Sequence, residues 1–281
     1  MTLERGRWTI WIMASVAVFL GLTVQQQLGA PASGLMVQAA GACLGAVLFF
    51  LLSHANPPQR AAVAVIGLVI LLMVVAAPLA MGPELAGARR WLLLGPLSVQ
   101  PSMVLLPLVI WLAAARHSGW AISLLIVATG GILALQFDAA ALTGLTLAWL
   151  AGHLPSAHRD EAHVWGVALG LIVLTVWAWT RPDALPSVAW VEQVLPNAWG
   201  LGLWTGVMAT LGALLVITPL ILLARGSQAA LSLAAFYAGL VGAALVGNYP
   251  LPVVGLGASL VVGWLMALGL ASAAARSRPP A

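Results

Sequence analysis

The stretch that decides the fold is NYPLPVVGLGASLVVGWLMALGL, residues 248–270. Two prolines and several small residues come directly before an apolar run long enough to cross a bilayer, for which about 20 residues are needed. Proline fixes the backbone and glycine frees it, so together they mark a turn. The stretch therefore predicts a stiff turn followed by a transmembrane helix, and raises the question of what the turn lines.

Composition excludes a soluble globular domain. Only 6% of the 281 residues are charged and 62% are hydrophobic, whereas about a quarter of the residues in soluble domains are charged. Because lipid offers backbone groups no hydrogen-bond partner, we expect an all-α polytopic membrane protein. The net charge of +4 comes from arginines that are mostly scattered along the chain. We therefore expect contact with membrane lipid and no binding of nucleic acid.

Polar, Gly and Pro clusters divide the chain, residues 1–281, into about ten transmembrane spans of a single domain. The fourth and sixth spans are short enough to be tilted or partly re-entrant. Gly34, Gly41 and Gly45 in the second span are typical of close helix packing. The spans are expected near residues 8–28, 35–53, 61–81, 102–115, 118–136, 139–153, 164–180, 199–224, 227–247 and 253–275.

Arginine placement predicts that both termini are cytoplasmic, because loops on the inner side of a membrane carry an excess of Arg and Lys. Ten spans with the N-terminus inside place eight arginines on inner segments and three on outer ones. All five histidines also fall on the inner side. The inner arginines are Arg5, Arg7, Arg60, Arg116, Arg159, Arg225, Arg276 and Arg278, and the outer ones are Arg89, Arg90 and Arg181.

Outer polar residues are few, and Asp138 is the most informative of them. It lies in LALQFDAAALTGL, residues 133–145, between two apolar runs with almost no loop. An ionised carboxylate at that depth is costly unless it is paired or faces water. We expect Asp138 to cap the sixth span through the first amide groups, or to face a cavity with Arg89 or Arg90 as its partner. Both interpretations can hold together.

The segment GARRWLLLGPLSVQPSM, residues 87–103, precedes the fourth span on the outer side. It mixes two arginines with a tryptophan and four leucines, so we expect it to lie along the membrane interface. Gln100, Pro101 and Ser102 are suited to the first turn of the helix that follows.

Three stretches together resemble the SEDS (shape, elongation, division and sporulation) family, the FtsW, RodA and SpoVE proteins of bacterial wall synthesis. Residues 87–103 resemble the family pattern GAxRWxxxGxxxxQPSE, residues 133–145 resemble LxQPDxGTA, and residues 250–260 resemble PLPFISYGGSS. Their order, spacing and outer location agree with the family. The matching positions are Arg90, Trp91, Gln100, Pro101, Ser102, Gln136, Asp138, Pro250, Pro252, Gly257 and Ser259.

The resemblance implies a multi-pass protein of the bacterial inner (cytoplasmic) membrane that acts in cell division or elongation. In that family, lipid II or a related undecaprenyl-linked substrate is polymerised into glycan strands at the outer face of the membrane. The implied activity is that of a peptidoglycan glycosyltransferase, and the implied partner is a class B penicillin-binding protein. Two alternatives stay open: a catalytically degenerate relative that serves as scaffold or regulator, and a flippase for the lipid-linked precursor.

The chain also departs from the family pattern. Met103 stands where the family has a glutamate, and Phe137 replaces a proline. The outer loop RPDALPSVAWVEQVLPNAWGLG, residues 181–202, is shorter than the family's loop, which carries an aspartate thought to be essential. Alignment on Gly202 places Glu192 within one residue of that aspartate, while alignment on Leu211-Gly212-Ala213 leaves no acid there.

A glycosyltransferase of this kind needs a base near the acceptor hydroxyl, and cations or a metal to offset the departing diphosphate. Glu192 or Asp138 would act as the base toward the acceptor sugar hydroxyl, and Arg89 and Arg90 would neutralise the departing diphosphate. We expect these side chains to meet in one outward-opening pocket. No cofactor or metal-ligand cluster is expected, although the chemistry leaves room for a divalent cation. The remaining expected substrate-binding residues are Gln100, Ser102, Gln136, Pro250, Pro252, Gly257 and Ser259.

Overall fold

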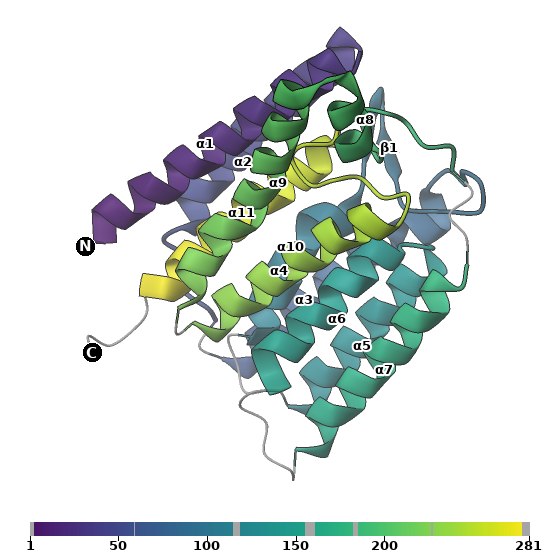
Figure 1. Cartoon of the computed structure of the whole chain (residues 1–281). Coiled ribbons are helices and arrows are strands. Elements are labelled where there is room, and N and C mark those ends of the chain that lie inside the picture. The colour runs from purple at the N-terminus through teal and green to yellow at the C-terminus, as the bar shows by residue number, and fades with distance from the viewer. Residues whose placement is uncertain are drawn as a thin grey trace.

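The computed structural model describes residues 3–58, 60–114, 119–154, 161–181, 185–225 and 227–276. Over these ranges the chain is a bundle of long helices, as expected for an all-α polytopic membrane protein (Figure 1). The long helices are α1 (Leu3–Gln27), α2 (Ala32–Leu52), α3 (Ala61–Met81), α4 (Pro101–Ala114), α5 (Trp120–Leu135), α6 (Ala139–His153), α7 (Ala162–Trp179), α9 (Leu203–Ala224), α10 (Gln228–Val246) and α11 (Ala258–Arg276). The smaller elements are β1 (Leu92–Leu94), β2 (Leu97–Val99) and α8 (Val194–Leu201).

Each of the ten expected spans coincides with one long helix. Seven of the described helices are long and apolar enough to cross a membrane: α1, α2, α3, α7, α9, α10 and α11. Helices α4, α5 and α6 have only 14, 16 and 15 residues, and at about 1.5 Å per residue they fall short of a bilayer core about 30 Å thick. Most residues of α4 and α6 are buried among other helices, which explains how such short helices fit inside the bundle.

The start of α1 and the end of α11 lie at the same end of the bundle (Figure 1). This arrangement agrees with an even number of spans. The opposite end carries the β1–β2 hairpin, α8 and the segment 247–257, and we call it the hairpin end. Of the arginines and histidines expected on the inner side, Arg116, Arg159, Arg278, His117 and His158 lie outside the described residues.

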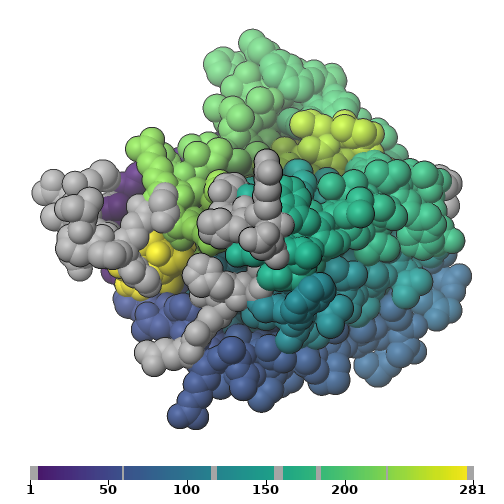
Figure 2. Space-filling model, turned by 90° about the horizontal axis from the view of Figure 1, so that it is seen from below, coloured from purple at the N-terminus to yellow at the C-terminus, as the bar shows by residue number. Residues whose placement is uncertain are grey.

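Helix α11, the apolar run of the opening stretch, is buried on almost every side. Small residues let its neighbours approach closely, because a Cβ at Gly263 would collide with the Met103 carbonyl oxygen of α4. Glycines of α2 face α11 in the same way, as Gly41 lies against Ala258 and Gly45 against Leu265. The expected packing role of the α2 glycines is therefore confirmed. Figure 2 shows early (blue), middle (teal) and late (green and yellow) parts of the chain packed against one another.

The segment before α4 contains a β-hairpin that the sequence analysis did not anticipate. Strands β1 and β2 pair antiparallel, with Leu92 opposite Val99, and Gly95 turns the chain at a φ of 61°. The side chains of Leu93 and Leu94 are each 61% exposed. Exposed leucines on this hairpin suit the expected place along a membrane interface.

Candidate functional site

A small enclosed cavity of about 30 Å³ lies at the hairpin end. That volume is room for about one water molecule. Its walls come from five separate parts of the sequence, so it exists only in the folded bundle. The lining residues are Arg90, Trp91, Gln100, Met103, Asp138, Ala140, Leu185, Glu192, Leu240, Asn248, Tyr249, Pro250 and Leu260.

Asp138 is both a helix cap and a cavity residue. It precedes α6, and its Oδ1 accepts a hydrogen bond of 3.1 Å from the Ala141 amide. Its Oδ2 accepts hydrogen bonds of 2.8 Å from Gln100 Nε2 and 3.3 Å from Ser102 Oγ. The carboxylate is only 1% exposed, and the helix N-terminus favours its negative charge. Asp138 therefore caps α6 and also faces the cavity.

The expectation that an arginine pairs with Asp138 was wrong. Among the described residues, no ion pair joins Asp138 to Arg89 or Arg90. The amide, the glutamine and the serine already satisfy the carboxylate, so the fold needs no cation there. The sequence pattern could not separate these neutral donors from an arginine, because all of them are outer-side polar residues.

Arg90 is 3% exposed and lines the cavity from the segment before β1. Its Nε donates to the Gln136 carbonyl at 3.3 Å, and its Nη2 donates to the Phe137 carbonyl. These carbonyls follow α5, so the cation sits at the negative end of that helix. The guanidinium also lies 5.5 Å from the centroid of the Tyr249 ring. Arg90 thus ties the hairpin segment to the α5–α6 junction.

Arg89 has a different environment from its neighbour. Its Nη2 lies 2.7 Å from Glu84 Oε2, and the two side chains are 45% and 52% exposed. It is not among the residues that line the cavity. The expectation that both arginines enter one pocket is therefore met by Arg90 alone.

The first turns of α4 and α11 meet beside Asp138. The Gln100 backbone amide donates to Ser259 Oγ at 3.0 Å, while the Gln100 side chain bonds Asp138. Met103 is 5% exposed and lines the cavity. The three stretches that carry the resemblance are thus joined in space by direct hydrogen bonds.

Five other predicted substrate-binding residues lie outside the cavity lining: Ser102, Gln136, Pro252, Gly257 and Ser259. Gln136 is fully buried, and its Nε2 donates to the Val75 carbonyl of α3 at 2.6 Å. Pro252 is buried in the turn before α11. The Gly257 amide donates to Gln38 Oε1 of α2 at 2.9 Å. In the structure these residues make packing and positioning contacts, whereas Pro250 lines the cavity.

Glu192 stands in the turn before α8, where its Oε2 accepts a hydrogen bond of 2.8 Å from the Val188 amide. It lines the enclosed cavity and also a larger open groove of about 640 Å³. Asn248 shares this double position, and its Nδ2 donates to the Leu185 carbonyl at 2.8 Å. Glu192 and Asn248 therefore stand between the groove and the cavity.

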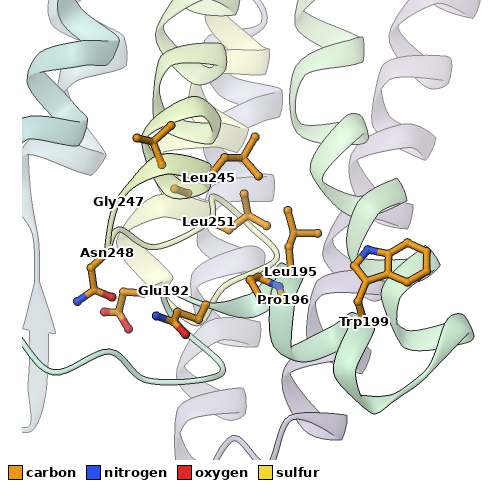
Figure 3. A pocket seen from close by; sticks show the side chains of 11 residues that line it. Glu192, Leu195, Pro196, Trp199, Leu245, Gly247, Asn248 and Leu251 are labelled. Carbon is orange, nitrogen blue, oxygen red and sulfur yellow. The ribbon is translucent and has the colours of Figure 1, made fainter.

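The groove has a polar end and an apolar side (Figure 3). Glu192 and Asn248 lie close together at one end, while Trp199 of α8 lies well away from them on the other side. Its lining is Glu192, Gln193, Leu195, Pro196, Trp199, Ala244, Leu245, Val246, Gly247, Asn248 and Leu251. The groove thus joins an apolar face to the polar cavity.

Sequence reasoning missed several residues of this site. Asn248 and Tyr249 lay in the opening stretch but matched no family position, and the groove side chains of α8 and α10 read as ordinary apolar residues. Buried glutamines in α1 and α2 were also overlooked, although polar residues inside membrane helices are candidates for function by default. In the described part of the chain, no three His, Cys, Asp or Glu side chains gather in the manner of a metal site.

The fold and the site define a polytopic helical membrane protein with a polar cavity at one end of its bundle. Residues 5–123 match the family of FtsW, RodA and SpoVE, described as cell cycle proteins. This match covers less than half of the chain, and over that range the chain is similar to the SEDS family. No curated protein matches the sequence.

Solved structures show the same fold over nearly the whole chain. The rod shape determining protein RodA of Thermus thermophilus superposes with a TM-score of 0.68 at 23% identity, covering 98% of each chain. A variant of that RodA with one aspartate changed to alanine gives 0.70 at 22% identity and the same coverage. A chain from a peptidoglycan synthase complex gives 0.65 at 24% identity, over 96% of this chain and 97% of the other. The structural likeness identifies the fold.

Proposed function

We propose that this protein is a membrane component of bacterial cell-wall synthesis that polymerises lipid II at the outer face of the inner membrane, with a class B penicillin-binding protein as its partner. The hairpin end would be the outer end. One observation carries the proposal: an acidic side chain, Glu192, stands between an amphipathic groove and a polar cavity. A substrate with a long isoprenoid chain, a diphosphate and sugars has the same alternation of apolar and polar parts.

The groove, rather than the cavity, has the size to take the sugar and lipid. The cavity holds about 30 Å³ and the groove about 640 Å³. Leu245 and Leu251 in the groove suit an isoprenoid chain, because apolar surface that is buried there is removed from water and from polar headgroups. The polar end with Glu192 and Asn248 would then face the sugar at the reacting bond.

The reaction joins the acceptor 4-hydroxyl to the anomeric carbon of the donor sugar. The new C–O bond forms as the bond between that carbon and the diphosphate oxygen breaks, and the diphosphate leaves with the electron pair. Glu192 takes the hydroxyl proton as general base. Among the residues that the structure describes, Arg90 is the cation that lines the cavity. Its positive charge stabilises the negative charge that develops on the diphosphate. Arg89, paired with Glu84 at the surface, has no part in this step.

A second candidate is a catalytically degenerate relative that acts as scaffold or regulator. Met103 favours it, because a buried thioether occupies the cavity wall where the family pattern has a glutamate. Such a protein would form a stable complex with a penicillin-binding protein without making polymer. A flippase would instead move labelled precursor across liposomes that contain no partner.

The decisive experiment incubates the purified protein and its partner with labelled lipid II and measures glycan polymer. We expect polymer from the wild type and a loss of about 100-fold or more in rate for Glu192→Gln, the usual scale for removal of a general base. Glu84→Gln is the matched control, because Glu84 is an exposed acid that pairs only with Arg89 among the described contacts. The control should keep wild-type rate.

The outcomes separate the candidates. No polymer from the wild type, beside a working family member under the same conditions, would remove the polymerase proposal. Full activity of Glu192→Gln would remove Glu192 as the base and leave Asp138 to be tested by Asp138→Asn. A stable complex with the penicillin-binding protein that makes no polymer would support the scaffold candidate.

A further inference from the structure

Two glutamines are buried at the hairpin end, one from each of the first two helices. Gln25 of α1 is 0% exposed and Gln38 of α2 is 1% exposed. A primary amide inside a membrane bundle is costly unless hydrogen bonds satisfy it. The burial of these two amides therefore depends on hydrogen-bond partners that lie close to them.

Both amides bind the turn before α11. Gln25 Nε2 lies 3.2 Å from the Val253 carbonyl oxygen and 3.1 Å from that of Val254. Gln38 Nε2 lies 3.3 Å from the carbonyl oxygens of Val253 and Gly255. Both side chains donate through their NH2 groups. They therefore bind three consecutive carbonyl oxygens that no helix or sheet satisfies.

The turn needs this support because its backbone is strained. Val253 has a φ of 68°, and a β-branched residue in the left-handed region costs of order 1–3 kcal/mol. Its carbonyl is the one acceptor that Gln25 and Gln38 share. A Cβ at Gly21 of α1 would also collide with this carbonyl, so α1 is shaped to fit the turn closely.

Residues 251–257 also hold the segment that carries Glu192. The Leu256 amide donates to the Trp190 carbonyl at 2.8 Å, and the Leu251 amide donates to the Val191 carbonyl at 3.4 Å. Glu192 is the next residue. A continuous path of hydrogen bonds therefore runs from α1 and α2, through residues 251–257, to the backbone beside the acid.

We propose that Gln25 and Gln38 are positioning residues, which fix Glu192 at the junction of groove and cavity by clamping the strained turn. The physical link is independent of activity, while its consequence for polymerisation rests on the proposed function. Neither glutamine lines the groove or the cavity, so their influence on the reaction passes through the turn.

The test compares Gln38→Met, Gln25→Met and the control Gln27→Met in the full chain. Methionine keeps the length of the side chain and removes its hydrogen bonds. Gln27 is exposed on the same helix as Gln25, and its Oε1 accepts a bond of 2.7 Å from Thr205 Oγ1 instead of binding the turn. Gln25→Met is the milder variant, because Gln38 makes one more bond to the turn than Gln25 does: its Oε1 also accepts from the Gly257 amide at 2.9 Å.

The first measurement is hydrogen–deuterium exchange of residues 185–193 and 248–257 in nanodiscs. The Val188 amide reports on Glu192 directly, because it donates to the Glu192 carboxylate. We expect exchange in both segments to rise about tenfold or more in Gln38→Met, less in Gln25→Met, and not at all in Gln27→Met. Unchanged exchange in residues 185–193 of Gln38→Met would overturn the proposal, whether or not the protein makes polymer.

The second measurement is polymerisation by the same variants with the partner present. Displacement of the base should lower kcat by about tenfold or more, with little change in KM. A purely structural loss would lower the amount of folded protein at constant kcat. Raised exchange with unchanged kcat would therefore overturn the positioning role. If even the wild type makes no polymer, the proposed function fails, and the exchange result alone decides whether the glutamines hold Glu192.

Discussion

Two segments supply the acidic side chains of the cavity, the start of α6 and the turn before α8, and they hold those side chains differently. Asp138 is 1% exposed and bonded to Gln100, Ser102 and a helix amide. Glu192 is half-buried and bonded to the Val188 amide within its own turn. The cavity thus has one acid that is fixed at the start of a helix and a second acid that lies in a turn, where neighbouring segments set its position.

Asp138 and Glu192 contribute to the site in different ways. Asp138 is satisfied by its partners, and those partners join α4, α6 and α11 to one another, so its main contribution is to the framework. Glu192 faces both the groove and the cavity, and a proton acceptor must be open to substrate. If this division is right, substitutions at the two acids should separate stability from activity.

The largest effect on stability is expected for Asp138→Ala. It removes a helix cap and leaves the Gln100 amide and the Ser102 hydroxyl without their acceptor, at a cost of about 2–4 kcal/mol. Glu192→Ala, at a half-buried position in a turn, should cost less than about 1 kcal/mol. Unfolding in mixed micelles with increasing SDS measures both. Equal losses would break the comparison.

Asp138→Asn sharpens the same test. Asparagine caps helices about as well as aspartate, and its side-chain oxygen can still accept from Gln100. We expect this variant to stay within about 1 kcal/mol of the wild type. A large loss of stability in Asp138→Asn would mean that the negative charge itself, rather than the cap and the hydrogen bonds, holds the framework.

Most of the framework could be predicted from the sequence, because its signals are local. Apolar runs separated by Pro, Gly and polar clusters located every long helix, and QFDAA predicted a cap at Asp138 since the acid directly precedes a helix. The β-hairpin was missed because two runs of three residues are too short to show a strand period. Its signal was Gly95-Pro96 between two leucine-rich runs, which is typical of a turn.

The contacts around Glu192 could not be predicted in the same way. Gln38 and Val253 are 215 residues apart in the chain, and a single sequence contains no measure of such a distance in space. The resemblance suggested two alignments of the loop, only one of which placed an acid near the site. Only the fold shows that Glu192 lines the cavity with Asp138 and Arg90.

An intermediate loss of stability is expected for Arg90→Lys. Lysine keeps the positive charge but loses the planar fork that reaches the Gln136 and Phe137 carbonyls together, and a lone ammonium is less suited to this buried place. The expected loss is about 1–3 kcal/mol in the same SDS titration. A neutral result would mean that the charge alone joins the hairpin segment to the α5–α6 junction.

The smallest effect is expected at the neighbouring residue, for Arg89→Ala. Arg89 and Glu84 form an exposed ion pair at 2.7 Å, and such pairs contribute about 0–1 kcal/mol because water and salt screen them. The difference between wild type and variant should shrink further as the salt concentration rises. A loss at Arg89 as large as that at Arg90 would show that the hairpin segment acts as one unit. Unequal losses would mean that burial, which places only one of two adjacent arginines in the cavity, sets the contribution of each.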